Sequence, residues 1–133
     1  MVMLFDQDHL PEDVYMIVFA TDQQALVGKM LVDEIKSKGV SLGKTEMSVF
    51  ATLLHDGTKV NITTKDAIGR LLIKQEAISY NKRQFYDRIL TPMKGMGLID
   101  YNIYTKKYSL SDRFGKVLTR ITLMWSKELD RKR

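Results

Sequence analysis

The stretch SYNKRQFYDRILTPMKGMGLIDYNIYTKKYSLSDRFG, residues 79–115, decides the fold because its residue pattern changes twice along its length. Its first part has apolar residues at the three-and-four spacing of one buried helical face. These residues are Phe85, Tyr86, Ile89, Leu90 and Met93. Gly95 and Gly97 end the helix, since glycine adopts the left-handed conformation of a helix C-cap at no steric cost. Pro92 lies inside the helix and predicts a kink, because proline removes one backbone hydrogen bond.

The second part of this stretch predicts a β-hairpin followed by another helix. Leu98–Tyr104 and Lys107–Leu110 are expected to be strands on either side of a turn at Thr105–Lys106. Ser111 is a candidate N-cap for the following helix, and Asp112 is well placed for the helix dipole.

This order of elements resembles the winged-helix family of DNA-binding proteins. In that family a recognition helix ends in a hydrophobic-x-x-x-Gly-Leu-Ile run, a β-wing follows, and Tyr-x-Leu-[Ser/Thr]-x-x-(x)-Gly opens the next helix. The matching residues are 93–99 and 108–115. The resemblance covers residues 45–115, and the interval from Leu72 to Asn81 is longer than the family's usual turn.

The resemblance implies a mainly α fold with a small β-wing (α+β). We expect a winged helix-turn-helix with an extra N-terminal helix and a long C-terminal dimerisation helix. A chain of 133 residues predicts a single domain. Within it we expect a helical extension at residues 10–40, a winged-helix core at 45–111 and the C-terminal helix at 112–133.

Composition and charge narrow the function classes. Hydrophobic residues at 44% and charged residues at 28% are typical of a globular protein. The chain has no cysteine, which excludes disulfides and thiolate metal sites. It shows neither a signal-peptide pattern nor an apolar run of membrane-spanning length, so we expect a cytoplasmic protein without membrane partners.

Charge is distributed unevenly along the chain. Residues 1–45 carry 4 Lys and Arg against 7 Asp and Glu, whereas residues 46–133 carry 17 Lys and Arg against 9 Asp and Glu. The basic part coincides with the winged-helix pattern, which favours nucleic-acid binding over the alternative of a merely solvated basic surface.

Two helices are expected before this core. Leu10–Asp13 has the signature of a helix start. Val14–Ala20 is apolar throughout, so that helix and strand both remain open, and we favour helix. Thr21 caps a helix over Asp22–Lys38, which Gly39 ends. Its apolar stripe consists of Leu26, Val27, Met30, Leu31 and Ile35.

Two further helices and a strand are expected next. Thr45 caps a helix that runs to about His55, with Gly57 as its stop. Its buried residues are Met47, Phe50, Ala51 and Leu54. Lys59–Ile62 alternates and is interpreted as the short strand that many winged helices pair with the wing.

The next predicted helix spans Lys65 to about Ile73 and is capped by Thr63 or Thr64. Its core face would be Ile68, Leu71 and Leu72, and its solvent face Lys65 and Arg70. In the family this helix crosses the DNA backbone while the next one enters the major groove.

The predicted DNA contacts follow from groove geometry. Arg83 offers a bidentate fork to guanine, and Gln84 offers a donor and an acceptor to adenine. Asn81 either does the same or only caps the helix. Lys82 and Arg88 are expected to point outward and hold phosphates. Tyrosines either reach phosphates through their hydroxyls or pack. With the wing-tip lysines, the candidate DNA-binding residues are Lys65, Arg70, Tyr80, Asn81, Lys82, Arg83, Gln84, Arg88, Lys106 and Lys107.

The C-terminal helix carries an apolar stripe over more than four turns. Such a stripe either closes the domain's own core or forms a dimer, and we favour a homodimer with two recognition helices. The candidate dimer-interface residues are Phe114, Leu118, Ile121 and Trp125.

Enzymatic motifs are missing from the sequence. The two histidines, His9 and His55, lie outside any metal-binding spacing, and no GxGxxG, GxxxxGK[ST] or GxSxG motif is present. We expect no catalytic residue, no metal and no cofactor.

The sequence therefore predicts a dimeric, sequence-specific regulator of transcription that binds double-stranded DNA. One alternative is a centromere- or origin-binding adaptor in plasmid or phage segregation or replication. The other is a winged-helix protein–protein interaction module without DNA contact.

Overall fold

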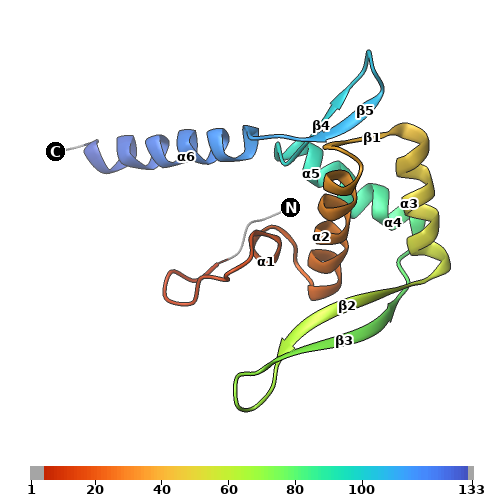
Figure 1. Cartoon of the computed structure of the whole chain (residues 1–133). Coiled ribbons are helices and arrows are strands. Elements are labelled where there is room, and N and C mark those ends of the chain that lie inside the picture. Colours follow the sequence, from red (N-terminus) through yellow and green to blue (C-terminus); the bar gives the residue numbers. More distant parts are fainter. Residues whose placement is uncertain (1–4, 132–133) are drawn as a thin grey trace.

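The computed structural model describes residues 5–131 and has an α+β architecture (Figure 1). The helices are α1 (Val14–Val18), α2 (Asp22–Ser37), α3 (Lys44–Asp56), α4 (Lys82–Phe85), α5 (Thr91–Gly95) and α6 (Arg113–Asp130), and the π-helical turn η1 (Tyr86–Leu90) joins α4 to α5. The strands are β1 (Ser41–Gly43), β2 (Thr58–Lys65), β3 (Leu71–Ile78), β4 (Ile99–Asn102) and β5 (Lys107–Leu110). We call the continuous helical segment α4–η1–α5, residues 82–95, the composite helix.

One hydrophobic core holds α2, α3 and the composite helix together. Leu31 and Ile35 of α2 are fully buried, as are Phe85 and Ile89 of the composite helix. The predicted helix after Thr21 is confirmed: the Thr21 hydroxyl accepts a hydrogen bond from the Gln24 amide at 3.1 Å. The helical interpretation of residues 14–20 is confirmed for Val14–Val18.

The helix α3 buries the four residues predicted for it, Met47, Phe50, Ala51 and Leu54. Its predicted cap is wrong, because Gly43 is the N-cap and Thr45 lies inside the first turn. The carboxylate of Glu46 accepts a hydrogen bond from the Gly43 amide at 3.2 Å and so satisfies this helix end. Gly57 ends the helix with a positive φ of 103°, as predicted.

A three-stranded antiparallel sheet has the order β1-β5-β4. Leu42 of β1 pairs with Tyr108 of β5, and Tyr108 in turn pairs with Tyr101 of β4. The strand that joins the predicted wing hairpin is therefore β1, and the prediction that Lys59–Ile62 takes this place is wrong. The hairpin itself lies where predicted, although its first strand is shorter than Leu98–Tyr104.

The predicted helix over Lys65–Ile73 is also wrong. Residues 58–78 form a separate two-stranded antiparallel ribbon, in which Thr58 pairs with Ile78 and Lys65 with Leu71 (Figure 1). Ile68, Leu71 and Leu72 are exposed on this ribbon and form no core face. The long interval before Asn81 is therefore mostly β3.

Pro92 leaves the composite helix continuous. The Thr91 amide donates to the Tyr86 carbonyl five residues earlier, which gives the π-helical turn η1 just before the proline. A wider turn relieves the contact between a proline ring and the preceding turn, so the predicted kink appears as a π-bulge. Gly97, with φ of 86°, follows the end of this helix as predicted.

The C-terminal helix α6 projects from the body in Figure 1. Phe114 packs against the core, but none of the described α6 residues is buried. The interpretation that its apolar stripe closes the domain's own core is therefore confirmed for Phe114 and wrong for the exposed Ile121 and Trp125. The predicted end of this helix at residue 133 lies outside the described residues. Over the described range, no helix combines the length and apolarity that crossing a membrane requires.

Candidate nucleic-acid interface

The composite helix is fixed on its inner side by large apolar residues. Phe85 contacts Phe50 of α3 edge to face, with 5.6 Å between ring centroids. Ile89, Leu90 and Met93 are at most 1% exposed. The helix start is held by the Asn81 side chain, which accepts a hydrogen bond from the Gln84 amide at 3.1 Å. Of the two roles open for Asn81, capping is thus observed.

The outer side of the composite helix is polar. The Arg83 side chain is 92% exposed, and its Nε lies 3.8 Å from Oδ2 of Asp87. Gln84 and Arg88 are exposed on the same side of the helix. Within the described part of the chain, Arg88 takes part in no ion pair. All three side chains are accessible to a ligand that offers hydrogen-bonding groups and negative charge, which would compete with Asp87 for Arg83.

Lys82 does not point outward as predicted. Its Nζ donates hydrogen bonds to Ser48 Oγ at 3.2 Å and to Thr52 Oγ1 at 3.1 Å, both on α3. Its backbone amide donates to Nδ1 of His55 at 3.1 Å. The ammonium group therefore ties the start of the composite helix to α3, because two hydroxyls offer it acceptors at short range.

Tyr80 is only 5% exposed and belongs to the core, so the alternative of a phosphate contact is wrong for this residue. Its backbone amide donates to the Leu54 carbonyl at 2.8 Å. Packing was the other role open for tyrosines, and for Tyr80 it is the observed one.

The β4–β5 hairpin lies next to the end of the composite helix. The Tyr101 and Tyr108 rings contact each other across the two strands, with centroids 4.6 Å apart and ring planes tilted by 44°. Nζ of Lys94 lies 5.9 Å and 5.8 Å from these two centroids. Burial raises the pKa of the Tyr108 hydroxyl, with smaller contributions from Tyr101 and Tyr86, so this ring stays neutral under the lysine.

The turn of this hairpin exposes both predicted lysines. The Asn102 side chain accepts hydrogen bonds from the amides of Tyr104 and Thr105, at 2.9 and 3.1 Å. Lys106 has a positive φ of 56°, and both Lys106 and Lys107 are exposed. The turn therefore presents two positive charges away from the body.

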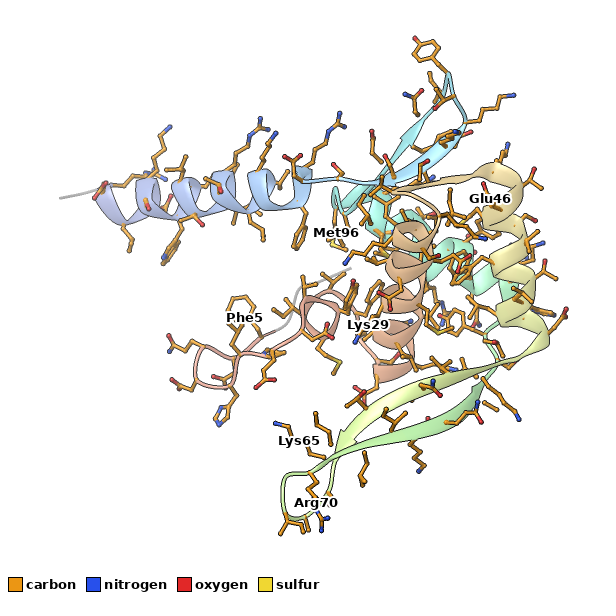
Figure 2. All side chains as sticks on the ribbon, in the orientation of Figure 1. Phe5, Lys29, Glu46, Lys65, Arg70 and Met96 are labelled. Carbon is orange, nitrogen blue, oxygen red and sulfur yellow. The ribbon has the colours of Figure 1, made fainter. Side chains whose placement is uncertain are left out.

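The structure does not bring Lys65 and Arg70 to the composite helix. Figure 2 shows both at the far end of the β2–β3 ribbon. Eight paired residues per strand correspond to about 23 Å between the base of the ribbon and this end. The ribbon was not predicted from the sequence, although Asp66 and Gly69 indicate a turn at its far end. The Asp66 carboxylate accepts from the amides of Ile68 and Arg70, and Gly69 has a positive φ of 82°.

The candidate dimer residues lie along one side of α6. Phe114 and Leu118 are half-buried at its start, whereas Ile121 and Trp125 are exposed, Trp125 to 63%. A cavity of about 360 Å³ lies between this start and the end of the composite helix, and Met96 and Gly97 contribute to its lining.

Among the described residues, no three His, Asp or Glu side chains form a group that could hold a metal ion. No family model, curated protein or solved structure matches the chain. The ligand of this candidate site is therefore inferred from the geometry of the site alone. The site is a polar helix face with two arginines, and it lies between two exposed hairpins.

Proposed function

We propose that the chain is a winged-helix protein that binds double-stranded DNA sequence-specifically and regulates transcription as a dimer. The observation that carries this proposal is the exposed face of the composite helix, with Arg83, Gln84 and Arg88 on one side and a fully buried apolar side opposite. An α-helix fits the major groove, and arginine and glutamine are the side chains that read guanine and adenine bidentately.

The arrangement of neighbouring elements supports the winged-helix resemblance. β1 pairs with the β4–β5 hairpin, as the first strand of many winged helices does, and the composite helix leads into that hairpin. The β2–β3 ribbon is then an insertion between α3 and the composite helix. Lys106 and Lys107 are exposed at the turn of that hairpin, and we assign them the backbone contact of a wing.

The alternative of a protein-interaction module has less support at this face. Protein-binding surfaces place large apolar or aromatic anchors at their centre. Among the described residues, the exposed side of the composite helix carries no large apolar side chain; the exposed ones lie in the segment before α1, in α1, α3 and α6, in the turn after α2 and in the two hairpins. A polar, basic face fits a phosphate-rich duplex better than an apolar protein surface.

Replacement of Arg83 by alanine tests the proposal. The measurement is the affinity of the wild type and of Arg83→Ala for a duplex selected from a random pool, and for its scrambled counterpart. Loss of a bidentate base contact costs about 1–3 kcal/mol, which corresponds to a loss of roughly 5- to 150-fold on the selected duplex. Arg88→Ala serves as the control and should weaken both duplexes similarly, because a phosphate contact does not distinguish sequences.

A wild type that selects no sequence, together with an Arg83→Ala variant that binds equally well, would contradict the proposal. The protein-interaction module would then be the better account of this face.

A further inference from the structure

The β2–β3 ribbon exposes one side that carries no acidic residue. Side chains alternate between the two sides of a ribbon. One side turns to α2, since Val60, Ile62 and Ile78 line cavities there. The opposite side, built from β2 and β3 in the observed register, has two cations and no carboxylate. Its residues are Lys59, Asn61, Thr63, Lys65, Leu71, Ile73, Gln75 and Ala77.

The far end of the ribbon is also basic. Its single carboxylate, Asp66, is engaged within the turn: Oδ1 accepts from the amides of Ile68 and Arg70 at 3.0 and 2.8 Å. Oδ2 of Asp66 lies 3.6 Å from Nε of Arg70. Ile68, at the outermost part of the turn, is 73% exposed. Ile68 is an exposed apolar side chain between Lys65 and Arg70. The ribbon projects from the body, so folding of the body does not explain an apolar residue at this position.

The base of the ribbon is attached directly to the start of the composite helix. Three residues, 79–81, connect Ile78 to Lys82, and the four Cα–Cα steps between them span about 14 Å at most. The Tyr80 amide and the Lys82 amide are both bound to α3, so this connection is held in place. If the first turns of the composite helix enter the major groove, the ribbon begins beside the same duplex.

We propose that the β2–β3 ribbon is a second DNA-contacting arm, which holds the backbone and minor groove next to the site of the composite helix. This inference rests on the proposed DNA binding. The arm is about 23 Å long, so it reaches about seven base pairs along a duplex with 3.4 Å per base pair. Lys59 and Lys65 contact phosphates, and Ile68 makes the apolar contact with sugars and base edges that minor-groove proteins use.

The test compares two double variants with equal loss of charge. Lys59→Ala/Lys65→Ala removes the arm's cations, and Lys29→Ala/Lys36→Ala removes two exposed cations from α2. Binding is measured by fluorescence anisotropy over a salt series, with random-sequence duplexes of about 15 and about 30 base pairs, of which only the longer has room for both contacts. For the arm variant we expect an affinity about ten-fold lower on the long duplex and a salt slope smaller by about 1.8 per protomer, from two lost phosphate contacts. The α2 variant should keep the slope of the wild type.

A third variant separates the apolar contact from the charges. Ile68→Ser should weaken binding to the long duplex while it leaves the salt slope unchanged. Circular dichroism and sedimentation of every variant verify folding and mass. Equal slopes for the two double variants, with Arg83→Ala still defective, would overturn the arm and leave the proposed function intact. A wild type without affinity for either duplex would overturn both. An arm variant that loses mass by dissociation would assign the ribbon to contacts between copies and also overturn the proposal.

Discussion

Lys82 and Arg88 lie on the same helix, carry the same charge and have different surroundings. Lys82 donates two hydrogen bonds to α3, whereas Arg88 is exposed. If the chain binds DNA as proposed, Arg88→Ala should therefore lower the salt slope of that binding by about 0.9 per protomer, the value for one phosphate contact. Lys82→Ala should leave the slope unchanged and lower the free energy of unfolding by about 1 kcal/mol, because its hydroxyl partners lose a donor.

Salt titrations of DNA affinity and urea unfolding of both variants test this pair. A reduced salt slope for Lys82→Ala, together with an unchanged free energy of unfolding, would indicate that Lys82 contacts phosphate. That result would contradict the observed contacts of Lys82 with α3.

At the residue scale, local partners could be predicted from sequence and distant partners could not. Thr21 caps α2, and Asn81, predicted either to read a base or to cap, caps the composite helix; each bonds an amide three residues on. Such contacts depend on neighbours in sequence alone. The partners of Lys82 lie 30 and 34 residues away on α3, and helical periodicity says only which side of its own helix a residue faces. The predicted outward direction of Lys82 failed for that reason.

At the scale of elements, Gly97 forms the joint between the composite helix, β4 and α6. Its φ is +86°, and a Cβ at this position would lie 2.9 Å from the Phe114 backbone nitrogen. The Gly97 carbonyl accepts a hydrogen bond from that same amide at 3.1 Å. Gly97→Ala should therefore destabilise the protein by about 2 kcal/mol or more, from left-handed strain and a backbone clash.

The matched control for this joint is Gly95→Ala, because a Cβ at Gly95 meets nothing within 4 Å and this residue is helical. That variant should be neutral or more stable by about 0.5–1 kcal/mol. Urea unfolding distinguishes the two, and equal stabilities would show that the joint tolerates a side chain.

At the β2–β3 ribbon, the prediction of secondary structure from the sequence was wrong. Ile68, Leu71 and Leu72 have the three-and-four spacing of a helix, and that spacing suggested a core face. The run of β-branched residues in β2 and the Asp66–Gly69 turn favour a hairpin instead. Elements that bury one face, such as α3 and the composite helix, were located correctly because burial imposes their period. The ribbon projects from the body and buries little, so that constraint is missing.

At the scale of the whole molecule, α6 is an amphipathic helix without a partner surface on its own chain. Ile121 and Trp125 are exposed on the side that begins with the half-buried Phe114. Leu123 is also exposed but lies on the opposite side, since two residues beyond Ile121 correspond to about 200° of helical rotation. Contiguous apolar surface of this kind is normally covered in solution, and in the proposed dimer the same stripe of a second copy would cover it.

The proposed dimer predicts different outcomes for Ile121→Glu and Leu123→Glu. Ile121→Glu places a charge in the proposed contact, and desolvation of an unpaired carboxylate opposes association. We expect this variant to sediment as a monomer at micromolar concentration, while Leu123→Glu sediments as a dimer like the wild type. The monomer should also bind a two-fold selected duplex far more weakly, because one composite helix instead of two then contacts the DNA. A wild type that is monomeric and folded, or a Leu123→Glu variant that dissociates as readily as Ile121→Glu, would contradict a dimer built on this stripe.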